Sequence, residues 1–119
     1  MKYMLLVYLD ENILTEDERQ ACYRDSAKFA RDLAATKNHL DASPLHPTSA
    51  ATSVRVRNGK RTVTDGPFAE TREQLGGFYL IEAGNLDEAI GIAEHIPVAT
   101  VGTIEIRPVL EISGLPEKR

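Results

Sequence analysis

The chain has few of the residues that mark disulfide-stabilised or membrane-spanning proteins. Its 119 residues include one cysteine, no tryptophan and seven other aromatic residues. A single cysteine, Cys22, cannot form an internal disulfide or hold a metal ion alone. The longest apolar runs, YMLLVYL and FYLI, are far shorter than the ~20 residues of a spanning helix. We therefore expect a cytoplasmic protein without a membrane segment.

Excess positive charge is also missing, since the formal net charge is -4. Nucleic-acid binding depends mostly on neutralising phosphates, so we expect no nucleic-acid partner. One basic run exists, Arg55, Arg57, Lys60 and Arg61, but it lacks the interleaved aromatic residues of a single-strand binder. No histidine, cysteine or carboxylate pair has zinc-site spacing, and no glycine-rich phosphate loop is present. The sequence predicts neither a metal nor a cofactor.

The pattern of the chain predicts one domain over residues 1–119. Thr15 and Glu18 form a capping box before a helix expected over 16–37, with Asn38 as its left-handed cap. Asn85 and Glu88 begin a second helix that Pro97 ends. Strands are expected at 2–9, 40–45, 76–83 and 102–109, and alternation on both sides of Asn58-Gly59 indicates a hairpin. This order is that of an α+β, ferredoxin-like sandwich with an inserted β-hairpin.

The strands MLLVYL and FYLI are apolar on both faces. Two helices can cover only one face of a four-stranded sheet, so the other face needs a second cover. Leaving large side chains bare would forgo roughly 1.5 to 3 kcal/mol each. We therefore expect a face-to-face homodimer.

The densest group of polar and chain-breaking residues is TVTDGPFAETREQLGGFYLIE, residues 62–82. Asp65 follows a strand and precedes Gly-Pro, where an acid either acts on a ligand or closes its own turn by accepting backbone N–H bonds. Arg72 near Asp65 would lower that acid's pKa and keep it ionised. His46, in SPLHPTS, is the one histidine expected to line the same cleft.

Four segments, MKYMLLVYLDE, SVRVRNGK, TDGPFAETREQLGGFYLIE and TIEIRPV, resemble the DGPF-domain branch of the YCII-related family. The resemblance covers almost the whole chain in order. It implies a cytoplasmic dimeric α/β barrel, often encoded near extracytoplasmic-function sigma factors. It supplies no settled activity.

Residue by residue, the resemblance places the signature acid at Asp65, its turn at Gly66-Pro67-Phe68 and a second acid at Glu70. Family members commonly have lysine where this chain has Arg72. An arginine stays protonated, so it holds an anion but cannot act as a base or form a Schiff base. We therefore expect Asp65 and His46 as catalytic residues, and Phe68, Glu70 and Arg72 as ligand-binding residues.

Two functions remain open at this stage. In the first, the protein is an enzyme that acts on a small polar or anionic molecule, with Asp65 as base or orienting acid. In the second, it is a non-catalytic binding or accessory module linked to transcriptional regulation through a partner. Asp65 in hydrogen-bond reach of a histidine or arginine inside a cleft would favour the enzyme. Asp65 bound only to its own turn would favour the module.

Overall fold

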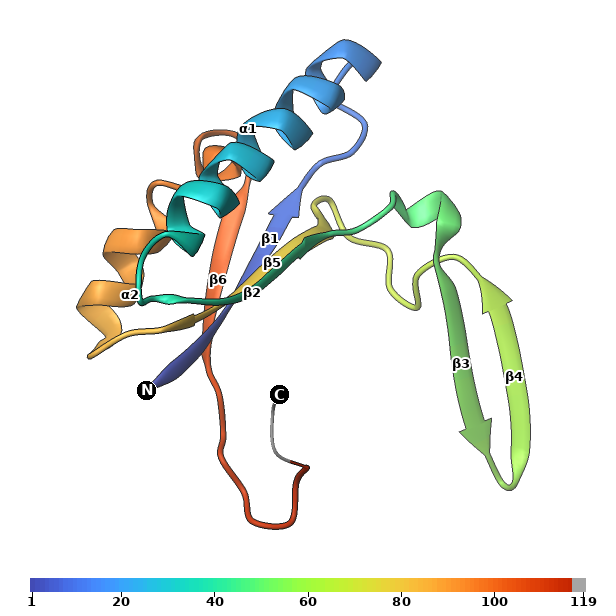
Figure 1. Cartoon of the computed structure of the whole chain (residues 1–119). Helices are drawn as coiled ribbons and strands as arrows, with labels where there is room; N and C mark the ends of the chain where they lie inside the picture. Colours follow the sequence, from blue (N-terminus) through green and yellow to red (C-terminus); the bar gives the residue numbers. More distant parts are fainter. Residues whose placement is uncertain (117–119) are drawn as a thin grey trace.

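A four-stranded antiparallel sheet carries both helices on one of its faces (Figure 1). The structure is a computed structural model that describes residues 1–116. Its main sheet has the order β2-β5-β1-β6. The strands of that sheet are β1 (Lys2–Leu9), β2 (His39–Pro44), β5 (Gln74–Glu82) and β6 (Thr103–Pro108). This strand order confirms the predicted ferredoxin-like α+β sandwich.

The remaining elements are two helices, two short 3-10 turns and a hairpin. The helices are α1 (Glu16–Ala34) and α2 (Leu86–Ala93), the turns are η1 (Thr48–Ala50) and η2 (Pro97–Thr100), and the hairpin strands are β3 (Thr52–Arg57) and β4 (Lys60–Asp65). No helix among residues 1–116 is long and apolar enough to cross a membrane.

Helix α1 begins as predicted and ends earlier than predicted. The Thr15 hydroxyl accepts from the Glu18 N–H, and the Glu18 carboxylate accepts from the Thr15 N–H, which completes the capping box. The helix stops at Ala34 because Thr36 takes the Leu33 carbonyl with both its N–H and its hydroxyl. Among the described non-glycine residues only Asn58 has a positive φ, so the prediction of Asn38 as a left-handed cap was wrong.

The core lies between the helices and one face of the sheet. Tyr3, Leu5 and Val7 alternate along β1 and are buried, and Leu5 is fully inaccessible. Across the ladder Leu5 lies opposite Tyr79 on one side and Ile106 on the other. The same alternation directs the intervening side chains of β1 to the opposite face.

That opposite face has no helix on it. By register, Met4, Leu6 and Tyr8 share it with Phe78 and Leu80 of β5. All of these except Leu80 are only partly buried. The two-sided apolar strands therefore have the face without helices that the sequence predicted.

The β3–β4 hairpin projects away from the main sheet (Figure 1). Its turn has φ values of 53° at Asn58 and 75° at Gly59, as the Asn-Gly pair predicted. β3 pairs only with β4, so the hairpin forms a separate two-stranded sheet.

Candidate functional site: a cavity between α1 and the sheet

A cavity of about 130 Å³ lies between α1 and the end of the sheet where β1 finishes and β5 begins. Small residues make the room for it. Ala27 and Ala30 of α1 face Ala42 of β2 and Gly77 of β5 across the space. A Cβ at Gly77 would lie 3.0 Å from the Ser43 carbonyl oxygen, so the two backbones meet where only glycine fits easily.

The cavity wall is largely apolar with a few polar groups set into it. The ring of Tyr79 packs edge-on against Phe29, with centroids 5.5 Å apart, and its hydroxyl donates to the Ser26 carbonyl at 3.3 Å. Burial raises the pKa of the Tyr79 hydroxyl. Burial likewise raises the pKa of the Cys22 thiol, which keeps the thiol protonated near neutral pH. Cys22 is thus a wall residue and has none of the thiolate character of a nucleophile.

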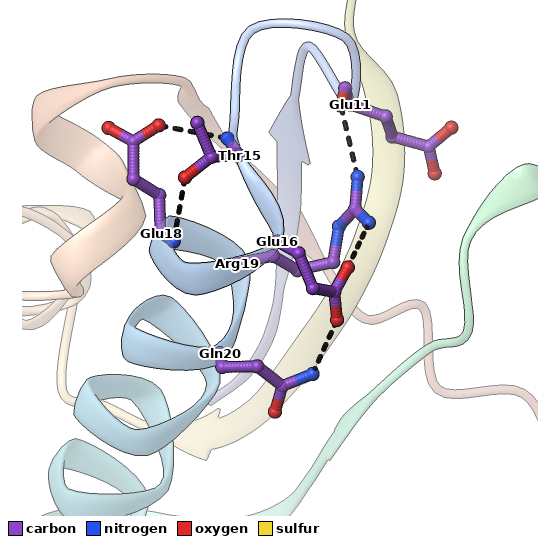
Figure 2. Close-up of polar contacts among 6 residues, drawn as sticks. All are labelled: Glu11, Thr15, Glu16, Glu18, Arg19 and Gln20. Atoms are coloured by element: carbon purple, nitrogen blue, oxygen red, sulfur yellow. Dashed lines mark hydrogen bonds and ion pairs between the residues drawn. The ribbon is translucent and has the colours of Figure 1, made fainter.

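Charged groups gather at the start of α1, where Arg19 and Glu11 reach the cavity wall. Figure 2 shows the Arg19 guanidinium between the Glu16 carboxylate and the Glu11 backbone carbonyl, at 3.0 and 3.1 Å. The side chain of Arg19 is about a quarter exposed. Its charge is therefore held in place at the edge of an apolar space, where the Glu16 carboxylate partly offsets it.

Glu11 ties three separate segments together beside the cavity. Its carboxylate accepts from the Thr48 N–H at 2.9 Å and from the Thr48 hydroxyl at 2.6 Å. Its N–H donates to Gln74 Oε1 at 2.9 Å. The amide group of Gln74 donates in turn to the carbonyls of Thr71 and Arg72. The loop of residues 66–73, here called the connecting loop, is anchored to the cavity wall in this way.

The five residues predicted for the site lie outside this cavity. Asp65 is the last residue of β4 and is exposed, opposite Thr52 in the ladder. Phe68, Glu70 and Arg72 lie exposed on the connecting loop. His46 is exposed, although its neighbours Leu45 and Pro47 line the cavity.

Within residues 1–116 the Asp65 carboxylate makes no hydrogen bond or ion pair, whether to His46, to Arg72 or to its own turn. The turn is closed instead by the Gly66 N–H, which donates to the Ala51 carbonyl at 2.7 Å. Within the single chain Asp65 therefore neither contacts a histidine or arginine in a cleft, which would favour an enzyme, nor binds its own turn, which would favour a binding module. The roles of these five residues stay predictions.

Sequence reasoning missed the residues that do line the cavity. Glu11 and Arg19 lie on a loop and a helix eight residues apart, whereas Tyr79 lies on a strand far along the chain, so no local motif joins all three. A signal existed in the small residues of facing elements, Ala30 and Gly77, because small side chains on both sides of a core leave space. Among residues 1–116 no group of three metal-ligating side chains comes together.

The fold and this cavity place the chain among small α+β proteins with a hollow between helix and sheet. Residues 1–113 match the YCII-related domain, and the chain belongs to that family. An uncharacterized protein of Rhizobium meliloti (strain 1021) is 38% identical over 114 residues, which cover 92% of each chain.

Among solved structures, the chain resembles 5-chloro-2-hydroxyhydroquinone dehydrochlorinase from Burkholderia phenoliruptrix AC1100, in complex with 2,5-dihydroxybenzoquinone. The TM-score is 0.55 at 14% identity, and the match covers 92% of this chain and 94% of the other. At 14% identity this likeness concerns the fold alone.

Proposed function

We propose that this protein binds a small molecule with an apolar ring-sized body and one polar or anionic group in the cavity between α1 and the sheet. The observation that carries the proposal is the cavity itself. Its volume of about 130 Å³ is close to that of an engineered apolar cavity of roughly 150 Å³ that binds benzene. A ring of that size would be enclosed by Tyr79, Ala30 and Gly77.

The polar group of the ligand would lie toward Arg19. Two of the five guanidinium N–H groups donate to the Glu16 carboxylate and the Glu11 carbonyl, so a ligand carboxylate or phenolate would be held by the remaining N–H groups. The sequence predicted a polar or anionic ligand, and the largely apolar wall adds a requirement for an apolar body. The solved dehydrochlorinase holds a dihydroxybenzoquinone, a molecule of this general size and kind.

We assign the connecting loop to the same site, as its outer rim. Gln74 fastens the loop to Glu11 beside the cavity, which supports a role for Phe68, Glu70 and Arg72 in contacting a bound molecule. Asp65 remains our candidate base or orienting acid, and His46 our candidate proton shuttle. Under this proposal the chain belongs to the DGPF branch of the family, an assignment that its signature residues support.

Thermal unfolding with small ring acids tests the cavity. Benzoate and 2,5-dihydroxybenzoquinone should raise the unfolding temperature, while acetate at the same concentration should not. A molecule that binds only the folded state adds about 2.7 kcal/mol at a hundred times its Kd. Ala30→Leu should abolish the shift by filling the cavity, and Ala34→Leu, one turn further along α1 and exposed, should leave it unchanged.

Equal shifts with Ala30→Leu and with the unaltered chain would place the ligand elsewhere and end the cavity assignment. Asp65→Ala separates the roles proposed for the rim. Loss of the benzoate shift in that variant, with its melting temperature in buffer unchanged, would support contact between Asp65 and the ligand. An undiminished shift would remove Asp65 from the site.

We further propose that the protein works as a homodimer joined through the open face of the sheet. The accessible surface of the chain is 8695 Å², against about 6,400 Å² for a compact monomer of 13.1 kDa. Its radius of gyration is 16.1 Å, against roughly 13.5 Å for a compact chain of this length. The excess is about 2,300 Å² per chain, or about 4,600 Å² for two chains, which is in the range of total surface that obligate homodimers bury.

The side chains of the open face fit that role. Met4, Leu6 and Phe78 form an apolar centre, and Glu105 and Arg107 of β6 flank it as an ion pair at 3.5 Å. An apolar centre with a charged rim is the usual anatomy of a protein interface.

Leu6→Asp tests the dimer, since a carboxylate in the middle of the apolar centre would be buried without a partner. Sedimentation equilibrium at micromolar concentration should give a dimer for the unaltered chain and a monomer for this variant. Lys2→Asp, at the end of the same strand, should retain the dimer. A monomeric unaltered chain would overturn the proposal.

A further inference from the structure

The β3–β4 hairpin, here called the arm, has an apolar face that nothing in the described chain covers. In its ladder Val54 lies opposite Val63, and Val56 is two residues further along the same face. These three valines are 61%, 53% and 60% exposed, in that order. An isolated two-stranded hairpin is marginally stable in water, so a covering partner would stabilise it.

The arm also differs in charge from the rest of the chain. Residues 52–65 contain four basic residues and one acid, a net charge of +3, so the remaining residues carry -7 of the total of -4. The four basic side chains, Arg55, Arg57, Lys60 and Arg61, form no ion pair within residues 1–116. A basic arm on an acidic body makes each copy complementary to another copy.

Two hydrogen bonds close the base of the arm. The Gly66 N–H donates to the Ala51 carbonyl, and the Ser53 hydroxyl donates to the Gly66 carbonyl, each at 2.7 Å. Both bonds join the two strands where the arm leaves the body. The three valines stay more than half exposed within residues 1–116, so a cover for them would come from another molecule.

We propose that the valine face of the arm docks on a second copy of this chain, so that each subunit of the dimer holds the other with its hairpin. This inference rests on the proposed dimer and extends it from the sheet to the arm. A nucleic acid is the weaker occupant, because a chain of net charge -4 repels it. By register Arg61 lies on the valine face, opposite Val56, while Arg55, Arg57 and Lys60 lie on the other face. The acidic first turn of α1, with Glu16, Asp17 and Glu18, is the kind of surface that would receive Arg61 beside the docked valines.

The test replaces the cross-strand valine pair, using V54T/V63T. Threonine keeps the β-branched shape, so the ladder should survive while the apolar surface is lost. The dimer dissociation constant should rise by about tenfold or more, equivalent to 1.4 kcal/mol per factor of ten. The matched control is Thr62→Ser on the opposite face of the arm, which should leave that constant unchanged.

Hydrogen exchange of residues 54–63 at two protein concentrations gives a readout of the arm itself. Exchange should slow when the dimer forms, and V54T/V63T should abolish the slowing. If V54T/V63T leaves both dissociation and exchange unchanged while Leu6→Asp still yields monomers, the arm proposal is wrong and the sheet dimer stands. If the unaltered chain is monomeric throughout, both are wrong. Co-purification of nucleic acid that V54T/V63T removes would also overturn the arm proposal.

Discussion

The main sheet and the arm differ in sequence pattern and in surroundings. β1 is apolar at successive positions, so both of its faces are apolar, whereas β3 alternates apolar and basic residues, as at Val54 and Arg55. Leu5 of β1 is fully buried, whereas Val54 is 61% exposed. Both patterns form strands, and the element packed above the strand decides whether an apolar face is buried. An uncovered apolar face in a folded chain indicates a missing partner.

The difference in unfolding free energy between the two regions should be largest when one apolar side chain is truncated in each. Leu5→Ala removes contacts from a closed core, and we expect a loss of about 2 to 5 kcal/mol in the free energy of unfolding. Val56→Ala removes exposed surface, and we expect less than about 0.5 kcal/mol at a concentration where the chain is monomeric. Urea unfolding of both variants, followed by circular dichroism, measures the two values.

The same pair also responds differently to protein concentration. The loss in Leu5→Ala should be the same in dilute and concentrated samples, because its contacts lie within one chain. The loss in Val56→Ala should grow with concentration if the arm docks on a partner. A large, concentration-independent loss in Val56→Ala would mean that the arm belongs to the core of its own chain.

A second comparison, between helix α2 of the body and the arm, uses glycine-to-alanine changes. Gly91 lies inside α2, and an added Cβ there would meet no atom within 4 Å, so Gly91→Ala should stabilise the chain by roughly 0.8 to 1 kcal/mol. Gly59, in the turn of the arm, has a φ of 75°. Alanine there is strained by about 1 to 2 kcal/mol, which should loosen the arm.

Thermal unfolding and hydrogen exchange separate these two effects. Gly91→Ala should raise the melting temperature, while Gly59→Ala should speed exchange in residues 54–63 and leave the exchange of β1 amides unchanged. Faster exchange in β1 as well would show that the arm and the sheet open as one cooperative unit.

The sequence was most informative where a physical rule acts over a few residues. The Thr15–Glu18 capping box and the Asn58-Gly59 turn were predicted and confirmed because each is settled by neighbouring backbone groups. The end of α1 was mispredicted, since the Thr36 hydroxyl competes for a helix carbonyl. The two-sided strand pattern correctly indicated a sheet face without helices.

The site was far less predictable than the fold. Local chemistry drew attention to Asp65 and Arg72, which lie on exposed segments, whereas the cavity is assembled from Glu11, Arg19 and Tyr79 by tertiary packing. Tyr79 meets the other two only once strand order and helix position are known. No sequence motif marks Glu11, and only the structure reveals it as the junction between the cavity wall and the connecting loop.

The smallest effect that we expect concerns Cys22, which lines the cavity between α1 and the covered face of the main sheet. Burial, the main cause, raises the pKa of this thiol above its ordinary value of 9.0, and a hydrogen bond with Ser26 acts in the opposite direction. Well below pH 9 the thiol is neutral in both the folded and the unfolded chain. As the pH rises further, the unfolded chain releases the proton first, so the contribution of Cys22 to stability is lost.

Cys22→Ala isolates this contribution, because the difference in unfolding free energy between the unaltered chain and the variant cancels other alkaline titrations such as that of Tyr79. We expect the difference to shift against the unaltered chain between about pH 8 and pH 10, by less than the effect of Leu5→Ala. Urea unfolding at the two pH values measures it. A difference that stays constant would mean that water reaches the thiol as freely in the folded protein as in the unfolded one, and the wall of the cavity would then be open at Cys22.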